Sequence, residues 1–585
     1  MARLKVHGTP IGASGAHETT SPSDSDYAAL PVPLRFIARK PHVTTLNMGQ
    51  LYSRLTLYLE PNLARFKVHV PLASWLRPEA SVCHHSGRPK GAVVDEVVPP
   101  DLPAVNFDWD PETWEKAARR AVELAVHVST GWERRRPGPE ETPDRILTRF
   151  QQPLPHSPVP FEAIADRLEE LASLSTFIGH PRWFAYITSS PNPVGVVGDF
   201  VTSAINPNIG LWRGGPAATA VEVQSIEWLK ELLGYPPEAE GVYTSGGQFA
   251  NIVAHAVIRD HAAGWDVRRG GMNPGGGAPN LRVYASEEIH YCHQQAAELL
   301  GMGSDAVRLV PVDEGYRMRV DALARMIEED RERGNRPIAI VATAGTVGTG
   351  AVDPIPELLR VARSEQIWLH VDGAYGAFAV VAPSAPEALR ALADADSIAC
   401  DPHKWLYAPV DAGVVLVREP GLLAGSFAFH ASYLHAGADT DGRVDLAELG
   451  PENSRRARGI KVWMALQAYG LDGYRDMIER NIQLADYMER LVEAAPDLVL
   501  AAPRELSIVC WRVEPEGVPD DRLDALQVEV IEELERRGVA IVSNARLRDG
   551  RTALRACIVN FRTGPGDVEA VVRASAEIGR ELARR

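Results

Sequence analysis

Short apolar runs alternate with helical patterns through the middle of the chain, and this alternation constrains the fold more than any other feature of the sequence. Strands that alternate with helices build a largely parallel sheet with helices on both faces. The pattern therefore predicts an α/β fold with a seven-stranded sheet, in which the last two strands, close in sequence, form an antiparallel pair at an edge. The runs expected to be strands are GVYTS (241–245), LRVYAS (281–286), AVRLVPV (306–312), PIAIVATAG (337–345), IWLHVD (367–372), SIAC (397–400) and GVVLVRE (413–419).

The rest of the sequence differs from this region in its pattern. Residues 1–104 combine a polar stretch with a few apolar patterns, and we expect a partly disordered extension without an assigned role. Residues 105–186 contain amphipathic patterns such as FEAIADRLEELASL and predict a helical segment. Residues 187–462 hold the large α/β domain, and the longer helices and short apolar runs of 463–585 predict a smaller α+β domain.

Composition and charge argue against several classes of partner. The chain has 585 residues, 45% hydrophobic and 24% charged, and its net charge of −16 without a basic block disfavours nucleic acid and anionic membranes. No apolar run is long enough to cross a bilayer, and the N-terminal residues lack the apolar segment of a secretory signal. Five scattered cysteines are typical of a reducing compartment, so we expect a cytoplasmic protein. Cys83-His84-His85 lacks a second ligand pair, and we predict no metal site.

A lysine follows directly on one of the predicted strands. In SIACDPHKWLY the strand stops at Asp401-Pro402, and Lys404 lies between His403 and Trp405. Burying an ammonium group costs free energy unless the group is paired or loses its proton. Lys404 is therefore either an ordinary surface lysine or a buried lysine with a chemical role.

Other strand ends carry residues that suit a flat, phosphorylated ligand. Asp372 ends IWLHVD before small residues, where it could face a ring closely or cap the next helix. Gly246 and Gly247 expose backbone N–H groups at a helix start, which suits a phosphate, although such turns are also plain connectors. His290 ends LRVYASEEIH and is either structural or catalytic. Together with Lys404, these residues match pyridoxal 5′-phosphate (PLP), whose aldehyde a lysine holds as a Schiff base.

From roughly Asn106 to its C-terminus the chain resembles the group II PLP-dependent amino-acid decarboxylases, the family of aromatic-L-amino-acid, histidine, tyrosine and glutamate decarboxylases. HVDGAYG followed by DPHKW is the most specific feature, and HASYL with SRRARGIKVW favours the aromatic-amino-acid branch. The resemblance implies a fold type I PLP enzyme that forms a homodimer with shared active sites, with residues 105–186 packed on the partner subunit. The motifs, in the family's order, are HPRWFAYITSSPNP, TSGGQFAN, EEIHYCHQQAAELLG, ATAGTVGTGAVDPI, WLHVDGAYGAF, DPHKWLY, HASYL and SRRARGIKVWMALQAYG.

The resemblance also implies a role for each residue of these motifs. Lys404 would form the Schiff base, and Asp372 would pair with the pyridine nitrogen. Ala374 would pack against one face of the ring, and His290 would stack on the other. The remaining expected cofactor contacts are Gly246, Gly247, Gln248, Thr346, Asp401 and His403. The family usually has Ser or Thr in place of Gln248 and Asn or Ser in place of Asp401. The phosphate contacts of these two residues therefore stay open, and Asp401 could instead bind neighbouring backbone N–H groups.

The implied reaction is decarboxylation of an L-amino acid to the amine and carbon dioxide through the Lys404 Schiff base and a quinonoid intermediate. Tyr433 of HASYL would reach the neighbouring subunit's active site and protonate Cα; relatives with phenylalanine there tend to form aldehydes. A buried structural tyrosine is the alternative. An oxidative, aldehyde-forming enzyme is the nearest rival, and a non-catalytic PLP-fold binding protein is a distant one.

The expected substrate pocket draws on the motifs FAYITSSPNP and NPNIGLWRGG. Phe184 and Trp212 favour an aromatic or large apolar side chain, but such residues are equally often plain core. Arg213 would instead suit a polar or acidic side chain. The expected pocket residues are Phe184, Tyr186, Ser189, Trp212 and Arg213.

Overall fold

The computed structural model describes residues 107–429 and 442–585, which belong to one compact unit, Val105–Arg585. The expectations for residues 1–104 lie outside the described residues. The α-helices are α1 (Pro111–Ser129), α2 (Pro143–Phe150), α3 (Phe161–Leu174), α4 (Pro193–Ile205), α5 (Pro216–Leu233), α6 (Gly247–Ala262), α7 (Val267–Gly270), α8 (Cys292–Leu299), α9 (Val320–Glu332), α10 (Ile355–Glu365), α11 (Pro402–Trp405), α12 (Leu422–Phe427), α13 (Gly459–Ala494), α14 (Asp520–Arg536) and α15 (Pro565–Ala583). None of the helices in this part of the chain combines the length and apolarity that crossing a membrane requires.

A seven-stranded sheet forms the centre of the unit, and its order is β1-β7-β6-β5-β4-β2-β3. Each of the seven apolar runs is a strand, so the predicted α/β fold is confirmed. All neighbouring pairs are parallel except those of β7, which runs antiparallel to both β1 and β6. The strands are β1 (Glu240–Thr244), β2 (Leu281–Ser286), β3 (Val307–Val310), β4 (Arg336–Thr343), β5 (Trp368–Gly373), β6 (Ser397–Cys400) and β7 (Gly413–Val417).

The predicted position of β7 at an edge is wrong, although its antiparallel pairing with β6 is confirmed. β1 adds to the free side of β7, so that β1 and β3 form the two edges. All five residues of β7 are buried, as expected of a strand with neighbours on both sides. Short sequence separation predicted the pairing of β6 and β7 but could not reveal that an earlier strand completes the sheet.

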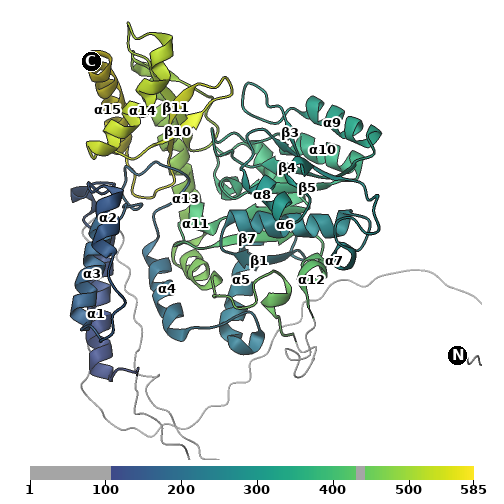
Figure 1. Ribbon diagram of the computed structural model, residues 1–585, viewed down its shortest axis with the longest axis horizontal. Coiled ribbons are helices and arrows are strands. Elements are labelled where there is room, and N and C mark those ends of the chain that lie inside the picture. The colour runs from purple at the N-terminus through teal and green to yellow at the C-terminus, as the bar shows by residue number, and fades with distance from the viewer. Residues whose placement is uncertain (1–106, 430–441) are drawn as a thin grey trace, which may run out of the picture. The chain divides into compact units, whose positions relative to one another are not determined.

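Helices cover both faces of the sheet, which explains why the strands are almost continuously apolar (Figure 1). Successive residues of β4 point to opposite faces of the sheet. Ile340 belongs to the core shared with α5, α9, α10 and α13, whereas Val341 belongs to the core shared with α6 and α8. Each face therefore has its own hydrophobic core.

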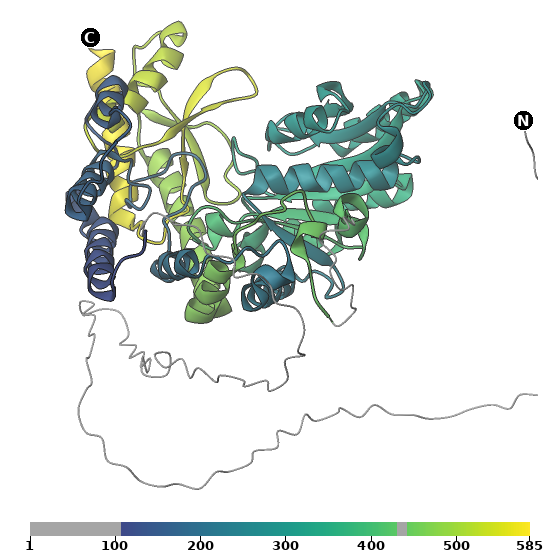
Figure 2. The same ribbon diagram turned by 60° about the horizontal axis from the view of Figure 1, so that its bottom comes forward.

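The C-terminal part has a separate four-stranded antiparallel sheet of order β10-β11-β9-β8 (Figure 2). Its core is shared with α13, α14 and α15. The predicted boundary between 462 and 463 falls inside α13, and the division of Val105–Arg585 into domains stays a prediction. The strands are β8 (Leu498–Leu500), β9 (Ile508–Val513), β10 (Ser543–Arg546) and β11 (Thr552–Cys557).

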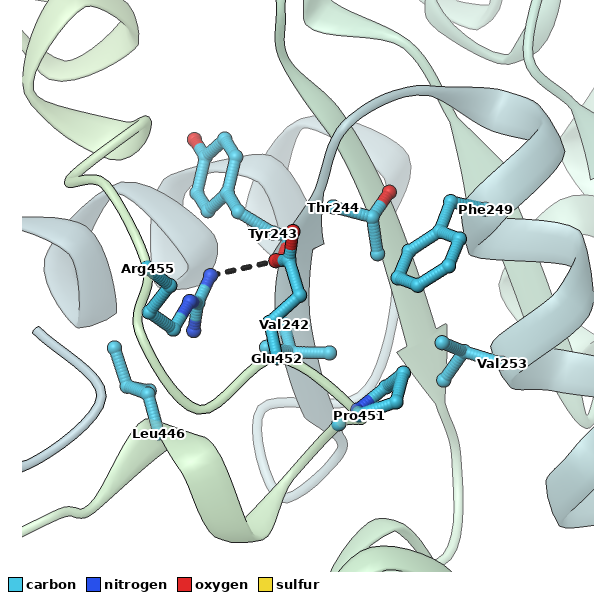
Figure 3. Close-up of a pocket in the computed structure, with 10 residues that line it drawn as sticks. Val242, Tyr243, Thr244, Phe249, Val253, Leu446, Pro451, Glu452 and Arg455 are labelled. Atoms are coloured by element: carbon cyan, nitrogen blue, oxygen red, sulfur yellow. Dashed lines mark hydrogen bonds between the residues drawn. The ribbon is translucent and has the colours of Figure 1, made fainter.

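The buried side chain of Arg455 ties the segment before α13 to α5 and to β1. Arg455 contacts Glu222 at 2.8 Å and donates a hydrogen bond to the backbone oxygen of Tyr243, also at 2.8 Å. Both charged side chains are almost completely buried, and breaking such a pair typically costs about 3–5 kcal/mol. The cavity beside Arg455 has a volume of about 10 Å³, enough for one water molecule at most (Figure 3). This cavity is therefore too small for a substrate, and the ion pair supports the strand that leads to α6.

Candidate active site

Lys404 lies on the short helix α11, directly after β6. Its Nζ atom is 3.1 Å from Oδ2 of Asp401, and only 19% of its side chain is exposed. Asp401 is almost fully buried, and Nε2 of His403 lies 3.6 Å from the same oxygen. Oδ1 of Asp401 has no hydrogen-bond partner among the described residues. Oδ2 of Asp401 therefore faces the side chains of His403 and Lys404, and the alternative in which Asp401 binds neighbouring backbone N–H groups is wrong.

Asp372 lies near the carboxyl end of the neighbouring strand β5, where three donors surround its carboxylate. Oδ2 accepts hydrogen bonds from Nε2 of His293 at 2.9 Å and from Nδ2 of Asn251 at 3.1 Å. Oδ1 accepts one from the backbone N–H of Ala374 at 3.1 Å. Burial alone would raise the pKa of Asp372, but the hydrogen bond and charge of His293, with the charge of Lys404, hold that pKa well below its usual range.

His293 and Asn251 were not among the predicted site residues. Both lie on helices that begin at strand-end motifs, α8 and α6. Asn251 follows Gly247 by four residues, which places the two on one face of α6. A polar residue inside the otherwise apolar pattern of α6 is the signal that could have revealed Asn251, whereas α8 is polar around His293 and carries no such signal.

Two glycines at the start of α6 leave room beside Asp401. Gly246 has φ +150°, a conformation that favours glycine, and a Cβ atom on Gly247 would lie 2.7 Å from both Oδ2 of Asp401 and Cβ of Ala374. No side chain caps this end of α6, so its first N–H groups point toward this space without a side-chain acceptor. An anion suits such a helix end.

The other predicted cofactor contacts lie on loops and helix starts around this sheet edge. Nε2 of Gln248 donates to Oε1 of Gln295 at 2.5 Å, so its amide points toward α8. His290 lies between β2 and α8, and its Nδ1 accepts the backbone N–H of Cys292. The hydroxyl of Thr346 bonds within its own turn, to Thr349 and to the backbone N–H of Ala351.

The predicted substrate pocket residues are spread over several environments. Phe184 is fully buried in the core of the C-terminal part, which favours the plain-core alternative. Ser189 donates a hydrogen bond to the backbone oxygen of His403 at 2.7 Å and thus contacts the lysine segment. Tyr186 is mostly exposed, with φ +55°.

Trp212 and Arg213 lie on a short 3-10 helix before α5, where the backbone N–H of Trp212 donates to Oδ1 of Asp445. Tyr433, the predicted proton donor, lies outside the described residues. The roles of these residues therefore stay predictions.

The residues at this edge fit PLP. Gly247 lets the start of α6 pass close to Asp401 and Ala374, where a Cβ atom would clash, and the uncapped helix start offers backbone N–H groups that suit a phosphate. Asp372 provides an ionised carboxylate for a pyridine nitrogen, and Lys404 provides a half-buried amine. The three groups come from the carboxyl ends of β1, β5 and β6, which lie along the same side of the sheet.

Comparison with known proteins supplies the family. The profile of the pyridoxal-dependent decarboxylase conserved domain matches residues 143–514. The chain belongs to this family. It is a PLP-dependent amino-acid decarboxylase, a carboxy-lyase. It is 34% identical over 390 residues to an aromatic-L-amino-acid decarboxylase of Bacillus atrophaeus, covering 66% of this chain and 79% of the relative. It is 30% identical over 425 residues to tryptophan decarboxylase 1 of Oryza sativa subsp. japonica, covering 69% and 82%.

Solved structures of relatives have the same fold as this decarboxylase. The structure of Oryza sativa TDC with PLP and tryptamine matches with a TM-score of 0.75 and 26% identity, covering 82% of this chain and all of that one. The structure of Rhodiola rosea 4-hydroxyphenylacetaldehyde synthase matches with a TM-score of 0.71 and 25% identity, covering 81% and 99%.

The glycine cradle yields a test of cofactor binding. We expect Gly247→Ala to weaken PLP binding at least tenfold, because the added Cβ would crowd Asp401 and Ala374. Gly425→Ala is the matched control, since a Cβ there meets open space and glycine has no special conformation to preserve. Titration of the apoprotein with PLP, followed by absorbance, measures both. Equal affinities for the two variants would contradict the assignment of the cradle.

Proposed function

We propose that this decarboxylase acts on an aromatic or large apolar L-amino acid and releases the amine and carbon dioxide. The observation that carries the chemistry is the convergence of Lys404, Asp372 and the Gly246–Gly247 cradle at one sheet edge. The substrate class is supported by the relatives, since 34% identity to an aromatic-L-amino-acid decarboxylase exceeds the 28% to the L-2,4-diaminobutyrate decarboxylase of Acinetobacter baumannii. The HASYL and SRRARGIKVW motifs support the same branch.

Each proposed catalytic side chain acts at a definite point of the reaction. When bound, PLP delocalises the electron pair left on Cα after carbon dioxide leaves, and a proton on its ring nitrogen improves this. The carboxylate of Asp372 would stabilise the proton on the ring nitrogen, because this carboxylate stays ionised. Lys404 holds the cofactor through its ε-amino group and must be neutral to attack again. His290 covers the ring and orients the carboxylate that is lost.

The lysine provides the direct test of this function. We expect Lys404→Ala to lose amine formation and the visible absorbance of the lysine-bound cofactor, because alanine has no amine to hold the aldehyde covalently. Lys404→Arg is the matched control for charge, and it should be equally inactive since guanidinium is not a nucleophile at neutral pH. Wild-type protein is incubated with each standard amino acid and its common hydroxylated derivatives, and amines are measured. Amine from diaminobutyrate or acidic amino acids, with none from aromatic ones, would overturn the substrate class.

Tyr433 is proposed to decide between amine and aldehyde. Both outcomes occur among the relatives, which include a phenylacetaldehyde synthase of a Rosa hybrid cultivar at 28% identity. In aerated buffer, Tyr433→Phe should lower amine release and raise aldehyde and peroxide, because without a proton donor to Cα the electron pair can pass to dissolved dioxygen, which is reduced to peroxide. Carbon dioxide, amine and peroxide are assayed together on the same sample. An unchanged product ratio would remove Tyr433 from the mechanism.

We also propose a homodimer whose active sites contain residues of both subunits. Large apolar side chains are exposed on three helices of the N-terminal half, as is typical of a surface that another chain covers. They are Trp114, Val122 and Val126 on α1, Ile164, Leu168 and Leu171 on α3, and Val197, Phe200, Val201 and Ile205 on α4.

Sedimentation of variants tests the dimer. Ile205→Glu should convert the wild-type dimer into monomer and lower activity, because it places a charge within the apolar face of α4. Val528→Glu, at an exposed valine on α14, should leave both the dimer and the activity unchanged. An active wild-type monomer would contradict the proposal.

A cytoplasmic location is the last part of the proposal. Four of the five cysteines lie in the described part of the chain, and all four are free and buried. Reduced, buried thiols are consistent with a reducing compartment.

A further inference from the structure

A network of buried polar side chains continues behind Asp372 and has no assigned role. The side chains of Asn251, His255, His293, His370 and Ser397 are each at most 1% exposed. Burying so many polar groups is costly unless each finds a partner. Nearly all of them do, and two branches of hydrogen bonds meet at Oδ2 of Asp372.

The first branch can donate in only one direction. Nε2 of neutral His370 faces Oδ1 of Asn251, which only accepts, so the other ring nitrogen, Nδ1, accepts the hydroxyl proton of Ser397 at 2.8 Å, and Oγ of Ser397 in turn accepts the indole N–H of Trp368 at 2.8 Å. His370 then carries its proton on Nε2, which lies 2.9 Å from Oδ1 of Asn251. The amide of Asn251 is thereby oriented with its NH₂ group toward Asp372. Burial lowers the pKa of His370 to about 3, which agrees with this neutral form.

The second branch runs through His293. Its Nε2 donates to Asp372, and its Nδ1 lies 2.9 Å from Nε2 of His255. Burial holds the pKa of His255 well below its usual value, so His255 is neutral. Burial also lowers the pKa of His293, but the adjacent Cys292 and Asp372 outweigh it and raise that pKa to about 10. Nδ1–H of His293 then donates to His255.

Both branches therefore end in a hydrogen bond donated to the same oxygen, Oδ2 of Asp372. Oδ2 of Asp372 is fully engaged by side chains, whereas Oδ1 accepts only the backbone N–H of Ala374 and keeps a lone pair. A carboxylic acid proton has no place on Oδ2, because both neighbours there are donors. The two donors to Oδ2 favour the ionised form and fix the orientation of the carboxylate.

We propose that His293 and Asn251 are positioning residues, which hold Asp372 as an oriented carboxylate so that Oδ1 can bind the protonated pyridine nitrogen of PLP. The inference rests on the proposed role of Asp372. Neither residue touches the reacting atoms; each acts through Asp372. A purely structural role in the core of α6 and α8 is the alternative.

The experiment compares two cofactors that differ only at the ring nitrogen. Dissociation constants are measured for apoprotein with PLP and with its carbocyclic analogue, in which CH replaces the ring nitrogen. We expect His293→Leu to weaken PLP binding about tenfold or more, the usual worth of a hydrogen bond to a charged group, and to leave the analogue unchanged. Asn251→Leu should act in the same direction. Gln294→Leu, next to His293 on α8, is the matched control and should change neither.

Two further variants test whether the effect passes through the donor and through Asp372. His293→Gln keeps a side-chain N–H and should restore most of the preference for PLP, which also guards against a leucine variant that fails to fold. In an Asp372→Asn background, His293→Leu should have no additional effect. The ¹⁵N chemical shift of labelled PLP should move toward the unprotonated form in His293→Leu.

Several results would overturn the inference. These are an equal loss of affinity for both cofactors, unchanged affinity for both, a glutamine variant as poor as the leucine variant, or an additive effect in the Asp372→Asn background. A wild-type preference for PLP that survives Asp372→Asn alone would instead refute the proposed role of Asp372. Loss of that preference in Asp372→Asn but not in His293→Leu would refute the inference alone.

Discussion

The buried carboxylate of Asp372 is the interaction on which the site depends. An isolated charge at this depth would take up a proton, because burial disfavours ionisation. The hydrogen bond and charge of His293, with the charge of Lys404, reverse that outcome, and Asn251 donates to the same oxygen as His293. The cost of burying the polar network behind Asp372 is offset by hydrogen bonds between its members, and the benefit is a negative charge at a fixed place beside Lys404.

The sheet topology explains how residues far apart in sequence meet around this charge. β7 runs antiparallel to both β1 and β6, so β1 has the same direction as the other strands even though it is separated from them. The carboxyl ends of β1, β5 and β6 therefore lie at one edge. β7 begins at that edge with Gly413, where a Cβ atom would lie 2.5 Å from the backbone of Gly246. A glycine is needed there because the loop after β1 passes directly over the start of β7.

The sequence predicted those features that depend on local pattern. Strands buried on both faces leave continuous apolar runs, and all seven runs are strands. Strand order depends on long-range pairing, so the place of β1 beside β7 was not predictable from the pattern. His293 and Asn251 were missed because a polar residue on a helix is usually exposed, and only the tertiary structure shows that these two face Asp372. Phe184 was predicted to line the pocket but is buried in a core, because an aromatic residue in a motif can do either and the sequence does not distinguish the two.

Asp401 shows how this decarboxylase can tolerate an acidic residue beside a phosphate cradle. Its carboxylate would repel a phosphate if it were unpaired, but Lys404 and His403 both contact Oδ2. Nδ1 of His403 accepts the backbone N–H of Ala412 at 3.1 Å, so the proton of the neutral ring is on Nε2, which faces Asp401. When Lys404 is engaged by the cofactor, that N–H remains. At 3.6 Å from Oδ2 this N–H is too far for a hydrogen bond, but the positive end of its dipole still faces the carboxylate of Asp401.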